Sequence, residues 1–201
     1  MPVLYRKLLI LPLLALGAGC TSSSSFSHRL DNTSVQSIEV CHGHGCARRK
    51  QLVLGNAEAR KLASLMAAGK GSAAAERLAI SNAVKYFEAR STAAIGVRDG
   101  PKSSFTASSH RGQMDCVDES TNTRSLLLYL QSRGLLKHHV VDKNVSRGFF
   151  ADGRYPHFTA VLRDEGGRKW VVDSWYEPAG GAPDIWPLAI WKTRGVGGER
   201  Y

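Results

Sequence analysis

Three side chains in the C-terminal half of the chain, Cys116, His157 and Asp173, are of the types that carry out nucleophilic catalysis together. A thiol can attack a carbonyl carbon, an imidazole can take the thiol proton, and a carboxylate can orient the imidazole. Cys116 lies where a polar loop is expected to become a helix. The positive end of a helix dipole favours the thiolate form of a cysteine, so we expect an activated thiol at this position.

His157 and Asp173 are expected on neighbouring strands of one hairpin. Two strand-like segments, 158–163 and 169–175, are separated by a Gly-containing turn at residues 164–167. Counting outward from the centre of this turn places His157 within about one position of the residue opposite Asp173. The two side chains are therefore predicted to lie at the same end of the hairpin and to face the same side.

The segments that must position these groups show helical and strand patterns. Apolar residues recur with helical spacing over 56–68 and 73–94, which predicts an antiparallel helical pair. Asn56 and Ser72 are the expected caps of these two helices. A third helix is predicted from Cys116 to about residue 133, with an apolar face supplied by residues 125–130.

The remaining segments contribute strands and a tail. Residues 34–40 alternate like a strand, and residues 135–141 and 149–150 have the composition of extended chain. Trp186 and Trp191 of the tail are expected to pack back onto the domain. Together with the helices, these patterns predict a single domain of helices and strands over residues 34–201.

Composition and charge narrow the class of protein. The chain has 201 residues, 43% hydrophobic and 22% charged, which is typical of a globular protein. The formal net charge is +10 at pH 7, but the basic residues are scattered, and the longest run is Arg48-Arg49-Lys50. We therefore expect no nucleic-acid partner, and we assign the excess charge to solvated surface with a modest attraction to anionic polymers.

The first residues have the pattern of an export signal. Arg6 and Lys7 precede an apolar run over residues 8–16, which is too short to span a membrane, and small residues follow it. The sequence predicts a signal peptide over residues 1–19. A soluble periplasmic product is one outcome of such a signal.

The end of this signal resembles the lipobox of bacterial lipoproteins. The resemblance rests on Gly17-Ala-Gly-Cys20, although family members usually have Leu where this chain has Gly17. It implies that Cys20 is acylated and held by membrane lipid, and that residues 20–33 form a flexible linker. The implied location is the bacterial cell envelope, on the periplasmic face of a membrane. Thr21 beside the lipid cysteine resembles outer-membrane sorting.

Export also bears on the cysteines, because the compartment outside the cytoplasm is oxidising. Cys41, Cys46 and Cys116 remain when Cys20 is set aside, so one of them is expected to be free. A disulfide between Cys41 and Cys46 leaves Cys116 as the free thiol. A bridge from Cys116 to either of the others would remove the nucleophile, and this alternative stays open.

The segment Cys41-His-Gly-His-Gly-Cys46 also has residue types that bind zinc. Structural zinc sites usually draw ligands from two separated pairs, and the sequence offers no second pair. We predict a disulfide-closed turn and no metal or other cofactor. A Cys/His metal site at residues 41–46 and a loop at the rim of the active site are the alternatives.

The residues around the three candidate groups resemble the transglutaminase-like branch of the papain-like cysteine enzymes. The similarity covers roughly residues 108–180 and rests on Asp115-Cys116, on Pro156-His157 with the four residues after it, and on Val171-Val-Asp-Ser-Trp175. It implies an α+β fold in which a helix carrying the cysteine packs on a small antiparallel sheet carrying the histidine and the acid.

The same resemblance implies a role for each residue. Cys116 would be the nucleophile, His157 the general base and then acid, and Asp173 the group that orients the imidazole. The Cys116 backbone N–H and a side-chain donor would hold the oxyanion. Gln113 is the candidate donor, although it lies closer to the cysteine than the corresponding glutamine of papain-type enzymes.

The sequence therefore predicts an exported, lipid-anchored cysteine hydrolase or acyltransferase. Its expected substrate is an amide or isopeptide bond in a peptide or peptidoglycan-like molecule. His138 and His139 are alternative bases, although both precede the candidate sheet. Two other functions stay open: a non-catalytic envelope binding or scaffold lipoprotein on the same fold, and a Cys/His metal-binding lipoprotein.

Overall fold

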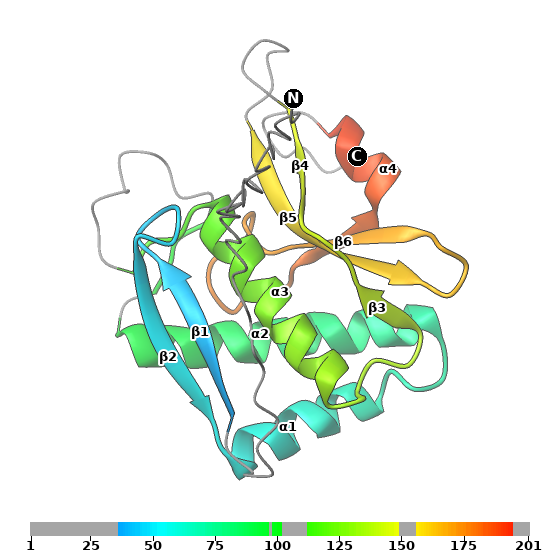
Figure 1. Cartoon of the computed structure of the whole chain (residues 1–201), viewed down its shortest axis with the longest axis horizontal. Coiled ribbons are helices and arrows are strands. Elements are labelled where there is room, and N and C mark those ends of the chain that lie inside the picture. Colours follow the sequence, from blue (N-terminus) through cyan, green and yellow to red (C-terminus); the bar gives the residue numbers. More distant parts are fainter. Residues whose placement is uncertain (1–35, 97, 102–111, 149–155, 195–201) are drawn as a thin grey trace, which may run out of the picture. The chain divides into compact units, whose positions relative to one another are not determined.

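Helices and small antiparallel sheets make up the part of the chain that the structure describes (Figure 1). The structure is a computed structural model, and it describes residues 36–96, 98–101, 112–148 and 156–194. The predicted signal peptide, the linker and Cys20 lie outside these residues, as do residues 149–150. The described residues belong to a unit that spans Thr33–Tyr201.

The first sheet is a hairpin of β1 (Gln36–His42) and β2 (Arg48–Leu54), which pair antiparallel. The predicted strand is thus confirmed over residues 36–40 and continues two residues further, to His42; residues 34 and 35 lie outside the described part. Alternation puts Ile38 and Val40 of β1 in the core, and Leu52 and Leu54 of β2 join them. The sequence analysis did not predict β2, because its first four residues are polar and exposed.

Three long helices follow the predicted segments. They are α1 (Asn56–Ala67), α2 (Ala73–Ile95) and α3 (Cys116–Ser132). The side chain of Ser72 accepts a hydrogen bond from Ala75 N at 3.1 Å, which confirms the predicted cap of α2. The expected Asn56 cap is wrong, because Asn56 is the first helical residue of α1 and Gly55 is its cap.

The second sheet is antiparallel throughout. Its strands are β3 (His139–Val141), β5 (His157–Asp164), β6 (Lys169–Asp173) and β7 (Asp184–Pro187), in that order, and β4 (Val145–Arg147) also pairs with β5. The short helix α4 (Leu188–Thr193) follows β7. The predicted β5–β6 hairpin is confirmed, with Ala160 opposite Val172.

Helix α3 connects the two sheets, since it contacts β1 on one side and β5 on the other (Figure 1). Its Leu126, Leu127 and Leu130 are fully buried in the core that the helices and sheets share. This arrangement confirms the α+β class. No helix among the described residues is long and apolar enough to cross a membrane.

Candidate active site

His157 and Asp173 meet at the end of the hairpin that the sequence analysis identified. His157 is the first residue of β5 and Asp173 the last of β6, and both are 2% exposed. Imidazole Nε2 lies 2.8 Å from carboxylate Oδ2. Because an ionised carboxylate can only accept, Nε2 carries the hydrogen and Nδ1 of a neutral imidazole has its lone pair available. The geometry fixes the tautomer that a general base requires.

The carboxylate of Asp173 is held from two further directions. The indole Nε1–H of Trp191, on α4, donates to the same Oδ2 at 2.7 Å. The backbone N–H of Trp175 donates to Oδ1 at 3.4 Å. These bonds keep the carboxylate facing His157, and they satisfy a charged group that would be costly to bury alone.

Aromatic rings surround the imidazole of His157. Ring centroids lie 4.7 Å away for Trp175, 5.5 Å for Tyr176 and 5.6 Å for Trp191. Arg147 of β4 lies behind this group, with its guanidinium 4.7 Å from the Trp191 ring and hydrogen-bonded to the Tyr176 hydroxyl. The rings exclude water from the His157–Asp173 hydrogen bond, and a lower local polarity strengthens it.

Cys116 begins helix α3, as predicted, and is 7% exposed. Asp115 caps the helix, with its side chain accepting from the backbone of Val117 at 3.1 Å and of Asp118 at 2.9 Å. The sulfur of Cys116 lies 4.0 Å from the carbonyl oxygen of Pro156, the residue before His157. The nucleophile candidate therefore lies against the main chain at the start of β5.

Among the described cysteines, Cys41 and Cys46 are joined in a disulfide, and Cys116 is free. The alternative bridge to Cys116 is absent from the described residues, so the Cys116 sulfur is not oxidised to a disulfide there. The two sulfurs of the Cys41–Cys46 bridge and an Asp118 oxygen lie within 4.8 Å of one another. Sulfurs oxidised to a disulfide supply no thiolate for a metal ion, so the proposed Cys/His metal site does not fit this structure.

The expected activation of the thiol by the helix N-terminus is not found. Burial raises the pKa of Cys116 to about 11, and the nearby carboxylates of Asp115 and Asp173 act in the same direction. Backbone N–H groups of Phe158 and of Cys116 itself act to lower this pKa, but burial has the larger effect. At neutral pH the sulfur is a thiol, and it needs a base to become a nucleophile.

The base candidate has one nitrogen left for that task. Nδ1 of His157 is buried and has no hydrogen-bond partner among the described residues. The sulfur of Cys116 therefore makes no hydrogen bond to Nδ1 here, although it contacts the residue next to His157. The structure brings thiol, imidazole and carboxylate to one place and leaves the thiol–imidazole contact unmade.

Three other candidates from the sequence are bound elsewhere. The amide of Gln113 donates to Arg98 O at 3.2 Å and accepts from Gly100 N at 3.4 Å. These bonds do not support Gln113 as an oxyanion donor, which stays a prediction. His139 pairs with buried Glu76 at 2.7 Å, and His138 Nε2 lies 3.1 Å from the carbonyl oxygen of Lys70, in the turn before α2. Their contacts tie β3 to the helices and do not involve Cys116.

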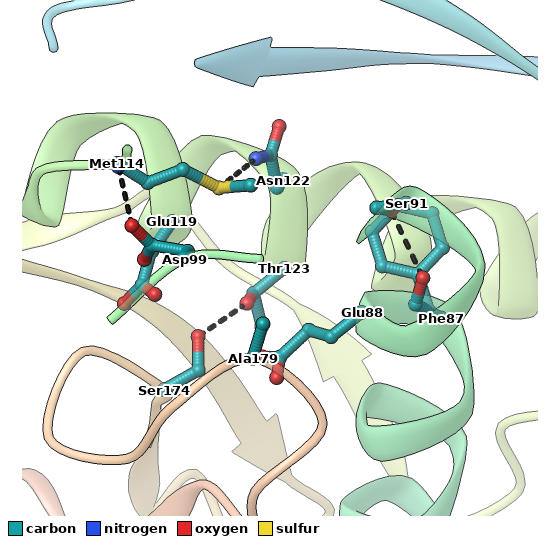
Figure 2. A pocket seen from close by; sticks show the side chains of 10 residues that line it. All are labelled: Phe87, Glu88, Ser91, Asp99, Met114, Glu119, Asn122, Thr123, Ser174 and Ala179. Carbon is teal, nitrogen blue, oxygen red and sulfur yellow. Dashed lines mark hydrogen bonds between the residues drawn. The ribbon is translucent and has the colours of Figure 1, made fainter. Parts of the chain in front are cut away.

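A cluster of acids behind the site was missed by the sequence analysis. Glu88, Asp99 and Glu119 line a cavity of about 20 Å³, together with Thr123 and Ser174 (Figure 2). A cavity of this size has room for a single water molecule. Helical periodicity from Cys116 would have placed Glu119 on the buried face of α3, which is the signal that could have found it.

The acid cluster links the helices to the segment that follows Asp173. Glu88 accepts a hydrogen bond from Gly180 N at 2.7 Å, and the hydroxyls of Ser174 and Thr123 lie 3.1 Å apart. Burial raises the pKa of Glu88 to about 7. Burial, first, and the neighbouring carboxyls raise the pKa of Glu119 well above its usual value, which favours its protonated form.

Comparisons with known proteins identify no relative. No family model matches this chain, and searches of curated proteins and of solved structures give no match. The functional argument therefore depends on the residues and the geometry alone.

Proposed function

We propose that this protein is a cysteine hydrolase or acyltransferase that breaks or exchanges amide or isopeptide bonds through Cys116, His157 and Asp173. The observation that carries the proposal is the buried 2.8 Å hydrogen bond between His157 Nε2 and Asp173 Oδ2, beside a free cysteine at a helix N-terminus. A transglutaminase-like variant of the α+β fold is part of the proposal. So are the signal peptide, acylation of Cys20 and a place on the periplasmic face of a bacterial membrane.

The chemistry follows from the nitrogen that is left available. His157 Nδ1 takes the proton of the Cys116 thiol, and Asp173 supports the charge that the imidazole gains. The thiolate attacks the amide carbonyl carbon, and the Cys116 N–H stabilises the developing oxyanion. The C–N bond breaks as Nδ1–H protonates the leaving amine, which gives a thioester. Water or a second amine, deprotonated by His157, then releases the acyl group.

The high pKa of Cys116 places a condition on this mechanism. Proton transfer requires the sulfur and Nδ1 to approach hydrogen-bond distance, a contact that often tightens when a substrate binds. A substrate carbonyl that displaces the Pro156 contact of the sulfur would favour this approach. The reaction is therefore proposed to begin from a neutral thiol, unlike enzymes that keep a resting thiolate.

A specific observation also favours a second function. Cys116 is buried, burial raises the pKa of its thiol to about 11, and no hydrogen bond joins the sulfur to the imidazole. These are properties of an inert buried thiol. An envelope binding or scaffold protein on the same fold is the alternative, and it predicts a Cys116 whose reactivity does not depend on His157.

An electrophilic probe separates the two functions. The full chain is treated with iodoacetamide at neutral pH, and peptide mapping by mass spectrometry assigns adducts to Cys20 and Cys116 separately. The enzyme proposal expects His157→Ala to lower the alkylation rate of Cys116 by about tenfold or more, as removal of a general base does. The matched control is His138→Ala, which removes an imidazole from β3's flank and should leave the rate unchanged. Equal rates in the parent and in His157→Ala would support the binding function.

The anchor is tested separately in bacterial cells that express the full chain. Labelled palmitate should be incorporated into the parent protein, and Cys20→Ser should abolish both the label and the membrane association. Label that persists in Cys20→Ser would contradict lipidation at this residue.

A further inference from the structure

The loop closed by the disulfide has an unusual backbone. Four successive residues have positive φ: Gly43 at 85°, His44 at 67°, Gly45 at 60° and Cys46 at 57°. Two of them are not glycine, and the left-handed region costs such residues conformational free energy. A backbone of this kind persists only where the surrounding structure compensates for it.

The compensation comes from the first turn of α3. The carboxylate of Asp118 accepts from His44 N at 2.7 Å and from Cys46 N at 2.5 Å. The carboxylate of Asp115 accepts from Gly45 N at 3.0 Å. Successive N–H groups in such a turn form a concave site for anions, and here the anions are two carboxylates of the protein itself.

The same two acids define the start of the helix that carries the nucleophile. Asp115 caps α3, and Asp118 completes a reciprocal capping box by accepting from Asp115 N at 3.4 Å. Cys116 lies between them in the sequence. Asp118 is fully buried, and although burial raises its pKa to about 6, it is a carboxylate at neutral pH. It can therefore accept from the loop and from the helix cap at once.

A second contact extends the attachment one turn along the helix. Asn122 exchanges two hydrogen bonds with the backbone of Cys41, accepting from its N–H at 2.7 Å and donating to its carbonyl at 2.8 Å. Before the loop, β1 pairs with β2, and His42 is opposite Arg48. The disulfide closes the loop between these attachments, so the loop and the first turns of α3 are fixed as one unit.

We propose that Asp118 is a positioning residue of the candidate active site, and that it acts by binding the disulfide loop (residues 41–46) to the first turn of α3. The loop and the two carboxylates hold the Cys116 sulfur against the main chain beside His157. The inference rests on the proposed function, because the position of Cys116 matters for catalysis only if His157 acts on it. It adds the disulfide loop, more than 70 residues away in sequence, to the elements that position the Cys116 side chain.

The test measures how strongly His157 enhances the reactivity of Cys116. The imidazole enhancement is defined as the ratio of Cys116 alkylation rates by iodoacetamide at pH 7 in the presence and in the absence of His157. We expect a ratio of about ten or more in the parent, falling to about two or less with Asp118→Asn, because a misplaced nucleophile loses the proton transfer. Glu39→Gln is the matched control, since it removes a half-buried carboxylate that pairs with Arg49 on the same hairpin, and it should keep the parent ratio.

The disulfide provides a second, independent way to open the unit. Cys41→Ser with Cys46→Ser should lower the enhancement as Asp118→Asn does, and the three substitutions together should lower it no further, because they break one connection. If Asp118→Asn does not fold, the cysteine pair carries the test alone. Effects that multiply, or a parent-like ratio in either variant, would overturn the positioning role.

Failure of the proposed function gives a different result. In that case the parent shows a ratio near one, and the positioning role is judged from the His157→Ala background. In that background, loss of the bonds between Asp118 and the disulfide loop should expose the buried sulfur. Its alkylation rate should rise by about fivefold or more, as greater access to a buried thiol does. An unchanged rate for Asp118→Asn in that background would overturn the inference as well.

Discussion

The surroundings of His157 and of Cys116, the candidate base and the candidate nucleophile, differ. His157 is hydrogen-bonded to Asp173 and enclosed by aromatic rings, and its remaining nitrogen is without a partner among the described residues. Cys116 is also buried, but burial raises its pKa to about 11 and its sulfur contacts a main-chain carbonyl. The imidazole of the candidate base is already oriented, while the candidate nucleophile is a protonated thiol. In the proposed mechanism, activation of the thiol therefore depends on bringing the two groups together.

Disrupting the hydrogen bonds between Asp173 and its partners should cause the largest loss of unfolding free energy. Asp173→Ala leaves the buried N–H groups of His157 and Trp191 without their acceptor, and each unsatisfied donor costs about 1–3 kcal/mol. We expect the free energy of unfolding in urea to fall by about 3–5 kcal/mol. Asp142→Ala is the control, because it removes a carboxylate that forms a surface ion pair with Lys169, and it should cost about 1 kcal/mol or less. Equal losses of unfolding free energy in the two variants would show that the buried hydrogen bonds of Asp173 stabilise the fold no more than a surface ion pair does.

The stability of the first turn of α3, which carries Cys116, should depend on the disulfide loop. Replacing Cys41 and Cys46 by Ser opens a short loop, and the chain-entropy model gives a loss of about 2 kcal/mol in the free energy of unfolding. Hydrogen exchange should show where the loss occurs. Amides of Val117 and Asp118 should exchange faster by a larger factor than those of Val161 and Val171 in the sheet. A uniform acceleration at both ends would contradict a local effect on α3.

A smaller effect is expected from the bond between Trp191 and Asp173. Trp191→Phe keeps an aromatic ring but removes the donor of a buried 2.7 Å hydrogen bond, so we expect a loss of about 1–2 kcal/mol in urea unfolding. Trp170→Phe removes a comparable indole bond to Asp164 that is only partly buried, and it should cost less. The prediction is wrong if Trp170→Phe proves the more destabilising of the two.

The cluster of Glu88, Asp99 and Glu119 should be visible as a pH effect. Burial raises the pKa of Glu88 from 4.5 to about 7, so the folded chain retains a proton that the unfolded chain releases. The contribution of Glu88 to the free energy of unfolding is therefore present below about pH 4.5 and is lost as the pH rises to about 7. The unfolding free energy of Glu88→Gln, measured from pH 4 to 8, should fall less than that of the parent. Parallel curves would show that Glu88 titrates normally.

Local patterns explain what the sequence could predict. The β5–β6 hairpin follows from alternation around a Gly-containing turn, and counting from this turn brought His157 near Asp173. The observed register differs from that count by one residue, since Ala160 is opposite Val172 and Thr159 therefore falls opposite Asp173. His157 lies two residues before Thr159 on the same face, from where its imidazole reaches the carboxylate. The three long helices follow from apolar periodicity. Strand β2 was missed because tertiary pairing with β1 overrides its polar composition.

Long-range packing determines the features that were missed. The bonds of Asp118 to His44 and Cys46 join residues more than 70 positions apart, and no local pattern encodes them. The expected thiolate at Cys116 was wrong for the same reason. Helix position is readable from the sequence, but the burial of the sulfur depends on the distant start of β5.

The pH dependence of Cys116 alkylation tests the central claim most directly. Rates are measured from pH 6 to 11 in the parent and in His157→Ala. We expect His157→Ala to follow the titration of an isolated buried thiol, with the rate rising about tenfold per pH unit toward a pKa of about 11, and the parent to keep an additional reactive component at neutral pH. Two superimposable profiles would contradict the account, because they would show that the imidazole does not act on the sulfur.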